Sequence, residues 1–113
     1  MAETALRSAI VAALNGTGLC RVWSVQCGRV RVRGGWMHLS PVGTPDVCGY
    51  TFRGGRFVGI EIKVSGNKTQ KDRAEAQRSF QEDIAAHGGI SGQVTSVDEA
   101  VALVRAAVEG RAA

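Results

Sequence analysis

The chain has 113 residues, of which 44% are hydrophobic, so it is long enough for one domain with a modest core and too short for two ordinary domains. Its formal net charge of +4 suits a polyanionic partner such as nucleic acid, although many small proteins with other functions are equally basic. Its three cysteines, Cys20, Cys27 and Cys48, lack the spacing and the histidine neighbours of a zinc site and are typical of buried thiols in a reducing compartment.

The N-terminal segment predicts an amphipathic helix that runs from Glu3 to about Leu14. Its apolar residues recur at helical spacing, and the sequence NGTG at positions 15–18 provides a stop signal. The segment lacks the basic start of a secretion signal and is far too short to span a membrane. We therefore expect a cytoplasmic protein that has no membrane partner.

The next part of the chain is rich in strand signals. Residues 20–33, CRVWSVQCGRVRVR, alternate and predict a hairpin with Gly28 near its turn or at a bulge. The glycine- and proline-containing residues 34–43 predict a loop. Residues 47–52 and 56–64 predict two further strands, joined through a Gly-Gly turn.

The second half predicts a helix, a short strand and a last helix. The first of these helices spans about residues 73–87, with Asp72 as its N-cap, and the strand covers residues 92–95. Ser96 and Glu99 form a capping box that opens the last helix. The predicted fold is α/β, a mixed sheet flanked by helices in the order α-β-β-β-α-β-α, with one possible extra hairpin strand near the N-terminus.

The strand that ends near Val64 carries two charged residues on one face. Because side chains alternate along a strand, its apolar residues share one face while Gly59, Glu61 and Lys63 share the other. Asp46 begins the preceding strand, so its carboxylate can converge with that of Glu61 at one end of the sheet. Two carboxylates this close repel each other unless a cation lies between them. The alternative is that Asp46 is a turn residue and that Glu61 and Lys63 are a solvated pair on an edge strand.

A hard divalent ion, Mg²⁺ or Mn²⁺, accepts two carboxylates and a strand carbonyl as ligands and keeps several waters. Such a site suits phosphodiester hydrolysis, because the ion lowers the pKa of water and offsets the charge that develops on the phosphate. Lys63 would orient or deprotonate the attacking water, or bind the phosphate.

In combination, these motifs resemble those of the PD-(D/E)xK nucleases and, within them, the virus-type replication-repair nuclease (VRR-NUC) domain. The resemblance runs from Glu3 to about Glu99. Its elements are the acid of the first helix at Glu3, the G-x-P-D motif at positions 43–46, the E-x-K motif at positions 61–63 and the helix glutamine at Gln77. It implies a restriction-endonuclease-like core and a Mg²⁺-dependent DNA endonuclease.

Two of the matched residues have alternative interpretations. Gln77 shares an otherwise apolar helix stripe with Phe80 and Ile84, and a buried amide there needs partners that an active-site cleft would provide. The alternative is an exposed glutamine. Glu3 lies in a first helical turn, where the helix dipole also favours an acid.

Basic residues suggest a DNA-binding surface. Arg29, Arg31 and Arg33 alternate with valines, which places three guanidinium groups on one strand face, where they would follow a phosphate backbone. Lys68 and Lys71 add positive charge just beyond Lys63. The alternative is a solvated strand face and a polar loop.

Three further side chains carry no assigned role. Trp36 would stack on an unpaired base or wedge a junction, but a loop tryptophan is as often a dimer or core contact. His38 and His87 are isolated from each other and from the carboxylates in sequence, so we expect neither a histidine metal site nor a histidine-activated nucleophile. No P-loop or dinucleotide fingerprint is present, so no nucleotide cofactor is expected.

The resemblance thus implies an endonuclease in which Asp46, Glu61 and the Ile62 carbonyl hold Mg²⁺, or Mn²⁺ as a substitute, with Lys63, Gln77 and Glu3 in support. Stand-alone members of the family are associated with phages and bacteria, and they include homodimers that cut branched DNA, so we expect a homodimer that acts on four-way junctions or flaps in replication, repair or recombination. One alternative is a DNA-binding or assembly module without turnover. Another is a site-specific restriction enzyme, although the chain leaves no room for an evident base-reading insertion.

Overall fold

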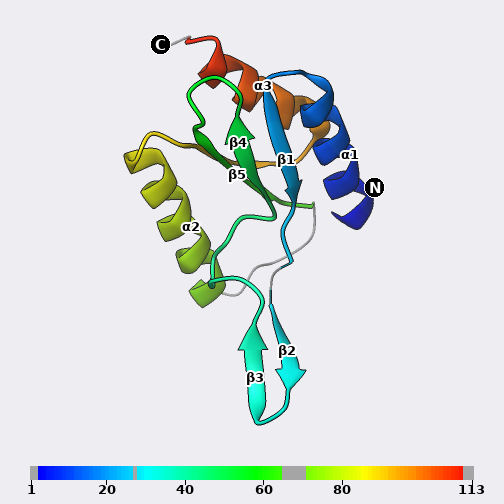
Figure 1. The fold of residues 1–113 in the computed structure, drawn as a ribbon, viewed down its shortest axis with the longest axis vertical. Coiled ribbons are helices and arrows are strands. Elements are labelled where there is room, and N and C mark those ends of the chain that lie inside the picture. Colours follow the sequence, from blue (N-terminus) through cyan, green and yellow to red (C-terminus); the bar gives the residue numbers. More distant parts are fainter. Residues whose placement is uncertain (1–2, 27, 65–70, 111–113) are drawn as a thin grey trace.

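The computed structural model describes residues 3–26, 28–64 and 71–110 (Figure 1). Its elements, in chain order, are α1 (Glu3–Gly16), β1 (Cys20–Ser24), β2 (Arg29–Val32), β3 (Gly35–His38), β4 (Val47–Thr51), β5 (Phe57–Ile62), α2 (Lys71–Ala86), β6 (Ile90–Val94) and α3 (Val97–Val108).

Four strands form a mixed sheet in the order β1-β4-β5-β6. The pairs β1–β4 and β4–β5 are antiparallel, whereas β5 and β6 are parallel and are connected through helix α2. Strands β2 and β3 pair only with each other and form a separate antiparallel hairpin, which leaves the chain between β1 and β4. The predicted α/β class, a mixed sheet flanked by helices, is confirmed.

One face of the sheet packs against helices α1 and α3 and forms the main core (Figure 1). The apolar face of β5 is its centre, since Val58, Ile60 and Ile62 are all buried, as the alternation in the sequence predicts. Helix α1 adds an apolar stripe at helical spacing, and Ala100 and Val104 of α3 complete the layer.

Helix α2 covers the opposite face of β5 and β6. Gly59 makes this packing possible, because a Cβ there would lie 2.7 Å from a methyl carbon of Ile84 in α2 and 2.9 Å from the ring of Pro45. Four exposed aromatic side chains lie on the same face of β1 and β4 or at its margin: Trp23, Tyr50, Phe52 and Phe57.

Two predictions for the first half of the chain are wrong. Residues 20–33 do not form a hairpin, because β1 pairs with β4 and β2 pairs with β3. Residues 34–43 are not all loop, because residues 35–38 form strand β3. Arg33 and Gly34 form a two-residue hairpin turn, in which Gly34 has a φ of +92°, and Gly35 begins strand β3 opposite Val32.

The helix boundaries show one further difference. Helix α2 begins at Lys71, so Asp72 lies in its first turn and is not its N-cap, a position where the helix dipole still favours a carboxylate. Helix α3 begins as predicted, since the hydroxyl of Ser96 accepts the Glu99 amide at 3.1 Å. The Glu99 carboxylate in turn accepts the main-chain N–H of Thr95 at 2.6 Å.

Within the described ranges, none of the helices combines the length and the apolar character that a membrane crossing requires. Cys20 and Cys48 are buried, as predicted, and burial raises the pKa of the Cys20 thiol. Cys27 lies outside the described residues.

Candidate active site

Glu61 is the only carboxylate among the described residues that is buried, with 2% of its surface exposed. It lies near the end of strand β5, on the face that α2 covers. Burial is the main cause that raises the pKa of Glu61 to about 8, and a hydrogen bond with Asp46 and the negative charge of Asp46 act in the same direction. The positive charges of Lys63 and Arg73 lower it by less.

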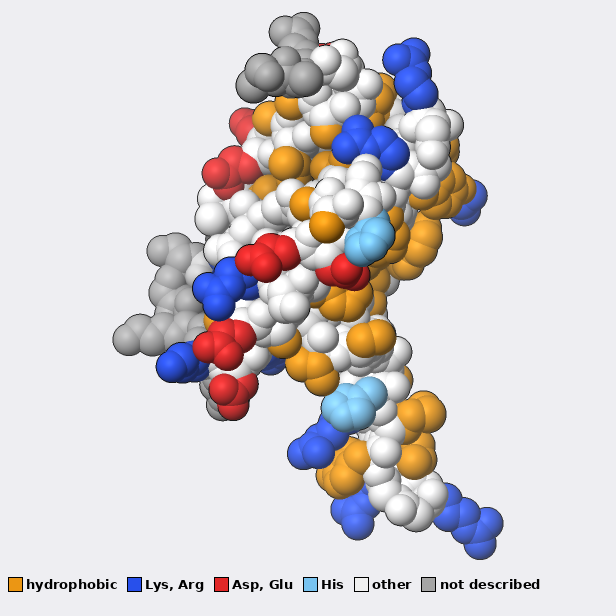
Figure 2. Space-filling model, turned by 90° about the vertical axis from the view of Figure 1, so that its left-hand side faces the viewer, with side chains coloured by type: hydrophobic (Ala, Val, Ile, Leu, Met, Phe, Trp, Pro, Cys, Tyr) orange, Lys and Arg blue, Asp and Glu red, His pale blue; other side chains and the backbone are white. Residues whose placement is uncertain are grey.

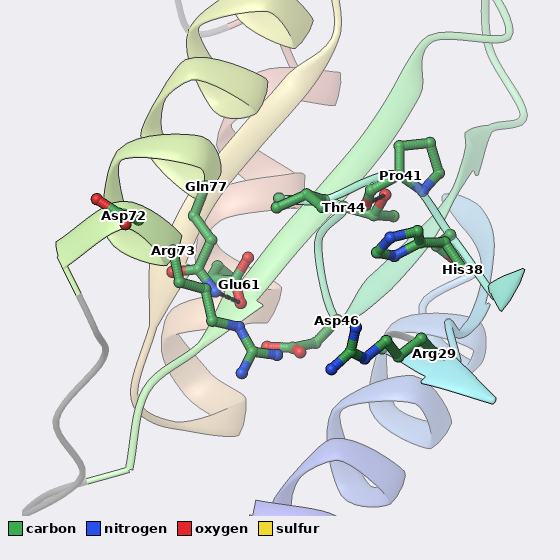
Figure 3. A pocket seen from close by; sticks show the side chains of 13 residues that line it. Arg29, His38, Pro41, Thr44, Asp46, Glu61, Asp72, Arg73 and Gln77 are labelled. Carbon is green, nitrogen blue, oxygen red and sulfur yellow. Dashed lines mark hydrogen bonds between the residues drawn. The ribbon is translucent and has the colours of Figure 1, made fainter. Parts of the chain in front are cut away.

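Asp46 is held beside Glu61 at the end of β5 (Figure 3). It directly precedes β4, and its Oδ2 accepts the main-chain N–H of Ile62 at 2.9 Å. Its other carboxylate oxygen lies 3.9 Å from a guanidinium nitrogen of Arg7 in α1. Its main-chain carbonyl accepts the N–H of Val25 at 2.9 Å. The two carboxylates therefore converge, as the sequence predicts, because contacts from β5, from α1 and from the residue after β1 fix Asp46.

Gln77 links Glu61 to Lys63 through two hydrogen bonds. The Lys63 ammonium donates to Gln77 Oε1 at 3.1 Å, and Gln77 Nε2 donates to Glu61 Oε1 at 2.9 Å. Gln77 is half-buried in helix α2, so it faces the site and is not a surface glutamine. Lys63 follows β5 directly, and its main-chain N–H donates to the carbonyl of Val94, which extends the pairing with β6.

The residues present fit a hard divalent ion. When both carboxyl groups are ionised, the buried Glu61 Oε2 accepts no hydrogen bond from the described residues, and it lies beside a second carboxylate that hinders its ionisation. A cation there would supply the missing contact and relieve the repulsion. The described part of the chain holds no group of three His, Cys, Asp or Glu side chains that could bind a metal, so an ion would rely on two carboxylates, a main-chain oxygen and water. The role of the Ile62 carbonyl stays a prediction.

Glu3 connects to the site through Arg7, which the sequence analysis missed. Glu3 is the first residue of α1, and its Oε2 lies 3.8 Å from the Arg7 guanidinium, one turn further along. The same nitrogen of Arg7 reaches Asp46, and Arg7 Nε is buried without a hydrogen-bond partner within the described ranges. The i, i+4 spacing of Glu3 and Arg7 was the available signal for this pair.

A pocket of about 460 Å³ opens over the carboxylates. Figure 3 shows Asp46, Glu61 and Gln77 on one side of it and Arg29 and His38 on the other. His38 is remote from the carboxylates in sequence but lines the same pocket, because the β2–β3 hairpin leaves and rejoins the chain beside it.

Arg73, in the first turn of α2, also lines the pocket and was missed by the sequence analysis. Its charge acts on Glu61. No motif marked Arg73, because its place beside Glu61 depends on how α2 packs on the sheet.

The predicted DNA-binding residues are only partly brought together. Arg29 and Arg31 lie on strand β2, whereas Arg33 belongs to the turn that follows it. Lys71 is exposed at the start of α2, and Lys68 lies outside the described residues. Their role in DNA binding stays a prediction.

Gly43 of the G-x-P-D motif has a steric role. Its φ is +90°, and a Cβ there would lie 2.5 Å from the carbonyl oxygen of Ala76, the neighbour of Gln77 in α2. The loop that leads to Asp46 therefore packs directly on the helix that carries Gln77, and only glycine allows this approach.

Gly43→Ala is accordingly expected to lower the free energy of unfolding by about 1–3 kcal/mol, and by more than Gly34→Ala does. Gly34 is the matched control, since its φ of +92° is equally unfavourable for alanine but nothing lies within 4 Å of the added carbon. Urea unfolding followed by circular dichroism would measure both. Equal losses would show that the contact with Ala76 is unimportant.

No protein-family model matches the chain, and a comparison with curated proteins finds no match either. A function is therefore inferred from the motifs and from the geometry of this site.

Proposed function

We propose that the protein is a Mg²⁺-dependent DNA endonuclease of the VRR-NUC type within the PD-(D/E)xK nucleases. The observation that carries the proposal is the connected set of side chains at the end of β5. Lys63, Gln77 and Glu61 form a hydrogen-bonded chain, and Asp46 lies against Glu61 at the edge of an open pocket. These are the residue types that metal-assisted phosphodiester hydrolysis needs.

In this proposal, Asp46, Glu61 and the carbonyl of Ile62 hold Mg²⁺, for which Mn²⁺ substitutes. The bound ion would polarise a phosphate oxygen and make an attacking water more acidic. Arg7 orients Asp46 from the side of α1, at 3.9 Å, and thereby connects Glu3 to the site.

Side chains of the protein would position the catalytic groups and the substrate. Gln77 fixes Glu61 and Lys63 relative to each other, since it donates to one and accepts from the other. The Lys63 ammonium would then orient the attacking water or stabilise the negative charge that develops on the phosphate. Arg73 and Arg29 line the pocket and would bind the flanking phosphates.

A homodimer is part of the same proposal. The exposed aromatic side chains on this face of β1 and β4 contact one another edge to face, with ring centroids 6.4 Å apart for Trp23 and Tyr50 and 6.1 Å apart for Tyr50 and Phe52. Exposed aromatic clusters are typical of interfaces, and a two-fold contact would place this patch on its own copy.

Light scattering is expected to give the mass of a dimer for the wild type and of a monomer for Tyr50→Ser. Val42→Ser, at an exposed site outside the patch, is the control and should leave the dimer intact. A wild-type monomer at all concentrations would remove this part of the proposal.

The function is tested by incubating the protein with labelled four-way junction, flap, single-stranded and linear duplex DNA, each with Mg²⁺, Mn²⁺ or EDTA. We expect cleavage only with a metal ion, and faster cleavage of the branched substrates. Tight binding of DNA with no cleavage of any substrate would instead indicate a binding or assembly module with the same fold. Cleavage confined to one short duplex sequence would indicate a site-specific enzyme.

A further inference from the structure

The hairpin β2–β3, which we call the basic arm, projects from the body of the protein (Figures 1 and 2). All eight residues of its two strands are exposed, and none belongs to the hydrophobic core. A two-stranded hairpin without a core is marginally stable by itself. Its side chains are therefore available to a partner.

The two faces of the basic arm differ in chemistry. In the register of the hairpin, Arg29 lies opposite His38 and Arg31 lies opposite Trp36, so these four side chains share one face. The other face carries Val30, Val32 and Met37, which are also exposed.

On the first face, two guanidinium groups lie over one indole ring. The Arg29 guanidinium carbon is 4.7 Å and that of Arg31 is 5.9 Å from the ring centroid of Trp36, within the range of cation–π contacts. Trp36 itself remains 56% exposed. Trp36 is therefore neither a core contact nor an isolated loop residue, and the stack presents a flat aromatic surface beside two planar cations.

The charged residues of the basic arm are all positive. No Asp or Glu occurs between Glu3 and Asp46, and the arm carries three of the arginines. Figure 2 shows basic, histidine and hydrophobic side chains on the arm and no acidic one on the side in view. This composition is complementary to a phosphate backbone.

The arm is also continuous with the candidate active site. Arg29 and His38, at its base, line the same pocket as Asp46 and Glu61 (Figure 3). A DNA strand bound along the arm would thus place its next phosphates at the carboxylates.

We propose that the basic arm binds unpaired nucleotides of a DNA strand, with Trp36 stacking on a base while Arg29 and Arg31 bind the adjoining phosphates. This inference rests on the proposed function, whose substrate class it specifies: DNA in which an unpaired segment adjoins the cleavage site, as at a flap or an open branch point. The bases of an intact duplex are stacked on one another, so an exposed indole gains nothing from them, whereas an unpaired base offers its full aromatic face.

The chain has two tryptophans, which permits a direct test. Trp23→Phe leaves Trp36 as the only tryptophan, and Trp36→Phe leaves Trp23, which is similarly exposed at 49% but lies on strand β1 of the main sheet. Each variant is titrated with a thymidine oligonucleotide, a flap and a blunt duplex in EDTA, so that no DNA is cut. The emission of Trp36 is expected to be quenched by the oligonucleotide and the flap but not by the duplex, and that of Trp23 should not change.

Affinity provides the second readout. Trp36→Ala is expected to weaken binding of the oligonucleotide and the flap by about tenfold and to leave duplex binding nearly unchanged, and Trp36→Phe should restore most of the loss. Unchanged Trp36 emission, or equal binding of all three DNAs by Trp36→Ala and the wild type, would overturn the inference. A lower mass of Trp36→Ala in light scattering, with unchanged DNA affinity, would overturn it in favour of contact with a second copy.

The two proposals fail separately. Quenching of Trp36 without metal-dependent cleavage of any substrate would refute the proposed nuclease function but support DNA binding by the basic arm. Metal-dependent cleavage that is lost in Asp46→Asn, with no quenching of Trp36, would support the nuclease function but refute DNA binding by the basic arm.

Discussion

Lys63→Ala is expected to lower Mg²⁺-dependent DNA cleavage by at least about 100-fold, while DNA affinity changes only a few-fold. The reason is that Gln77 holds Lys63 at the site, where in the proposed mechanism its charge would act on the reacting phosphate or water and would contribute little to DNA affinity. Single-turnover cleavage at saturating DNA would measure the rate, and fluorescence anisotropy in EDTA would measure the affinity.

Lys71→Ala is the matched control for this experiment. Lys71 is an exposed residue at the start of α2, so its loss removes the same charge from outside the hydrogen-bonded set. We expect a few-fold weaker binding and an unchanged rate at saturation. A Lys63→Ala protein that cuts at the wild-type rate would remove Lys63 from the mechanism.

In EDTA, the free energy of unfolding is expected to fall as the pH rises from about 5 to about 9. Glu61 is the cause, because its pKa is about 8 in the folded protein and near 4.5 in the unfolded chain. Between these values the unfolded chain has released the proton that the folded protein retains, so each step up in pH favours unfolding. Above about 8 both states are ionised, and the dependence ends.

Divalent ions are expected to reverse this loss. An ion bound at Asp46 and Glu61 would take the place of the proton, so Mg²⁺ or Mn²⁺ should raise the melting temperature clearly at pH 8–9 and hardly at all at pH 5. Thermal unfolding followed by circular dichroism across this pH range, with and without the ion, measures the effect.

Two substitutions test whether Glu61 causes the pH dependence and the response to the ion. Glu61→Gln should remove most of both the pH dependence and the response to the ion. Glu99→Gln is the control, because hydrogen bonds from Thr95 lower the pKa of Glu99, whose contribution to stability is lost only at acidic pH. A melting temperature that is independent of the ion at every pH would contradict the proposed site.

Much of the fold was predictable because its signals are local. The N-cap at Ser96, the helical spacing in α1 and the alternation along β5 each depend on neighbouring residues alone, and the structure confirms them. The pairing of β1 with β4 was not predictable in this way, because it joins residues more than twenty positions apart. The hairpin β2–β3 was missed because Gly34 and Gly35 were interpreted as a break in the structure.

The same distinction between local signals and long-range packing applies to the residues of the candidate site. The motif residues Asp46, Glu61 and Lys63 could be placed together from strand alternation and one hairpin. Gln77 was assigned from the resemblance to the family's helix glutamine, which its place on an apolar helix stripe supports. By contrast, Arg73 and His38 reach the pocket only through the packing of α2 and the return of the basic arm. Such contacts are set by the whole fold, and a motif does not contain them.

The most direct test of the central claim is the cleavage of a labelled four-way junction by the wild type and by Asp46→Asn, purified in parallel, with Mg²⁺ or with EDTA. Asparagine keeps the size of the side chain and can still accept the Ile62 N–H, but it removes the charge that would hold the ion. The proposal predicts cleavage by the wild type with Mg²⁺ only, and at least about 100-fold less by Asp46→Asn. Cleavage that persists in EDTA, or that is equal in the two proteins, would contradict it.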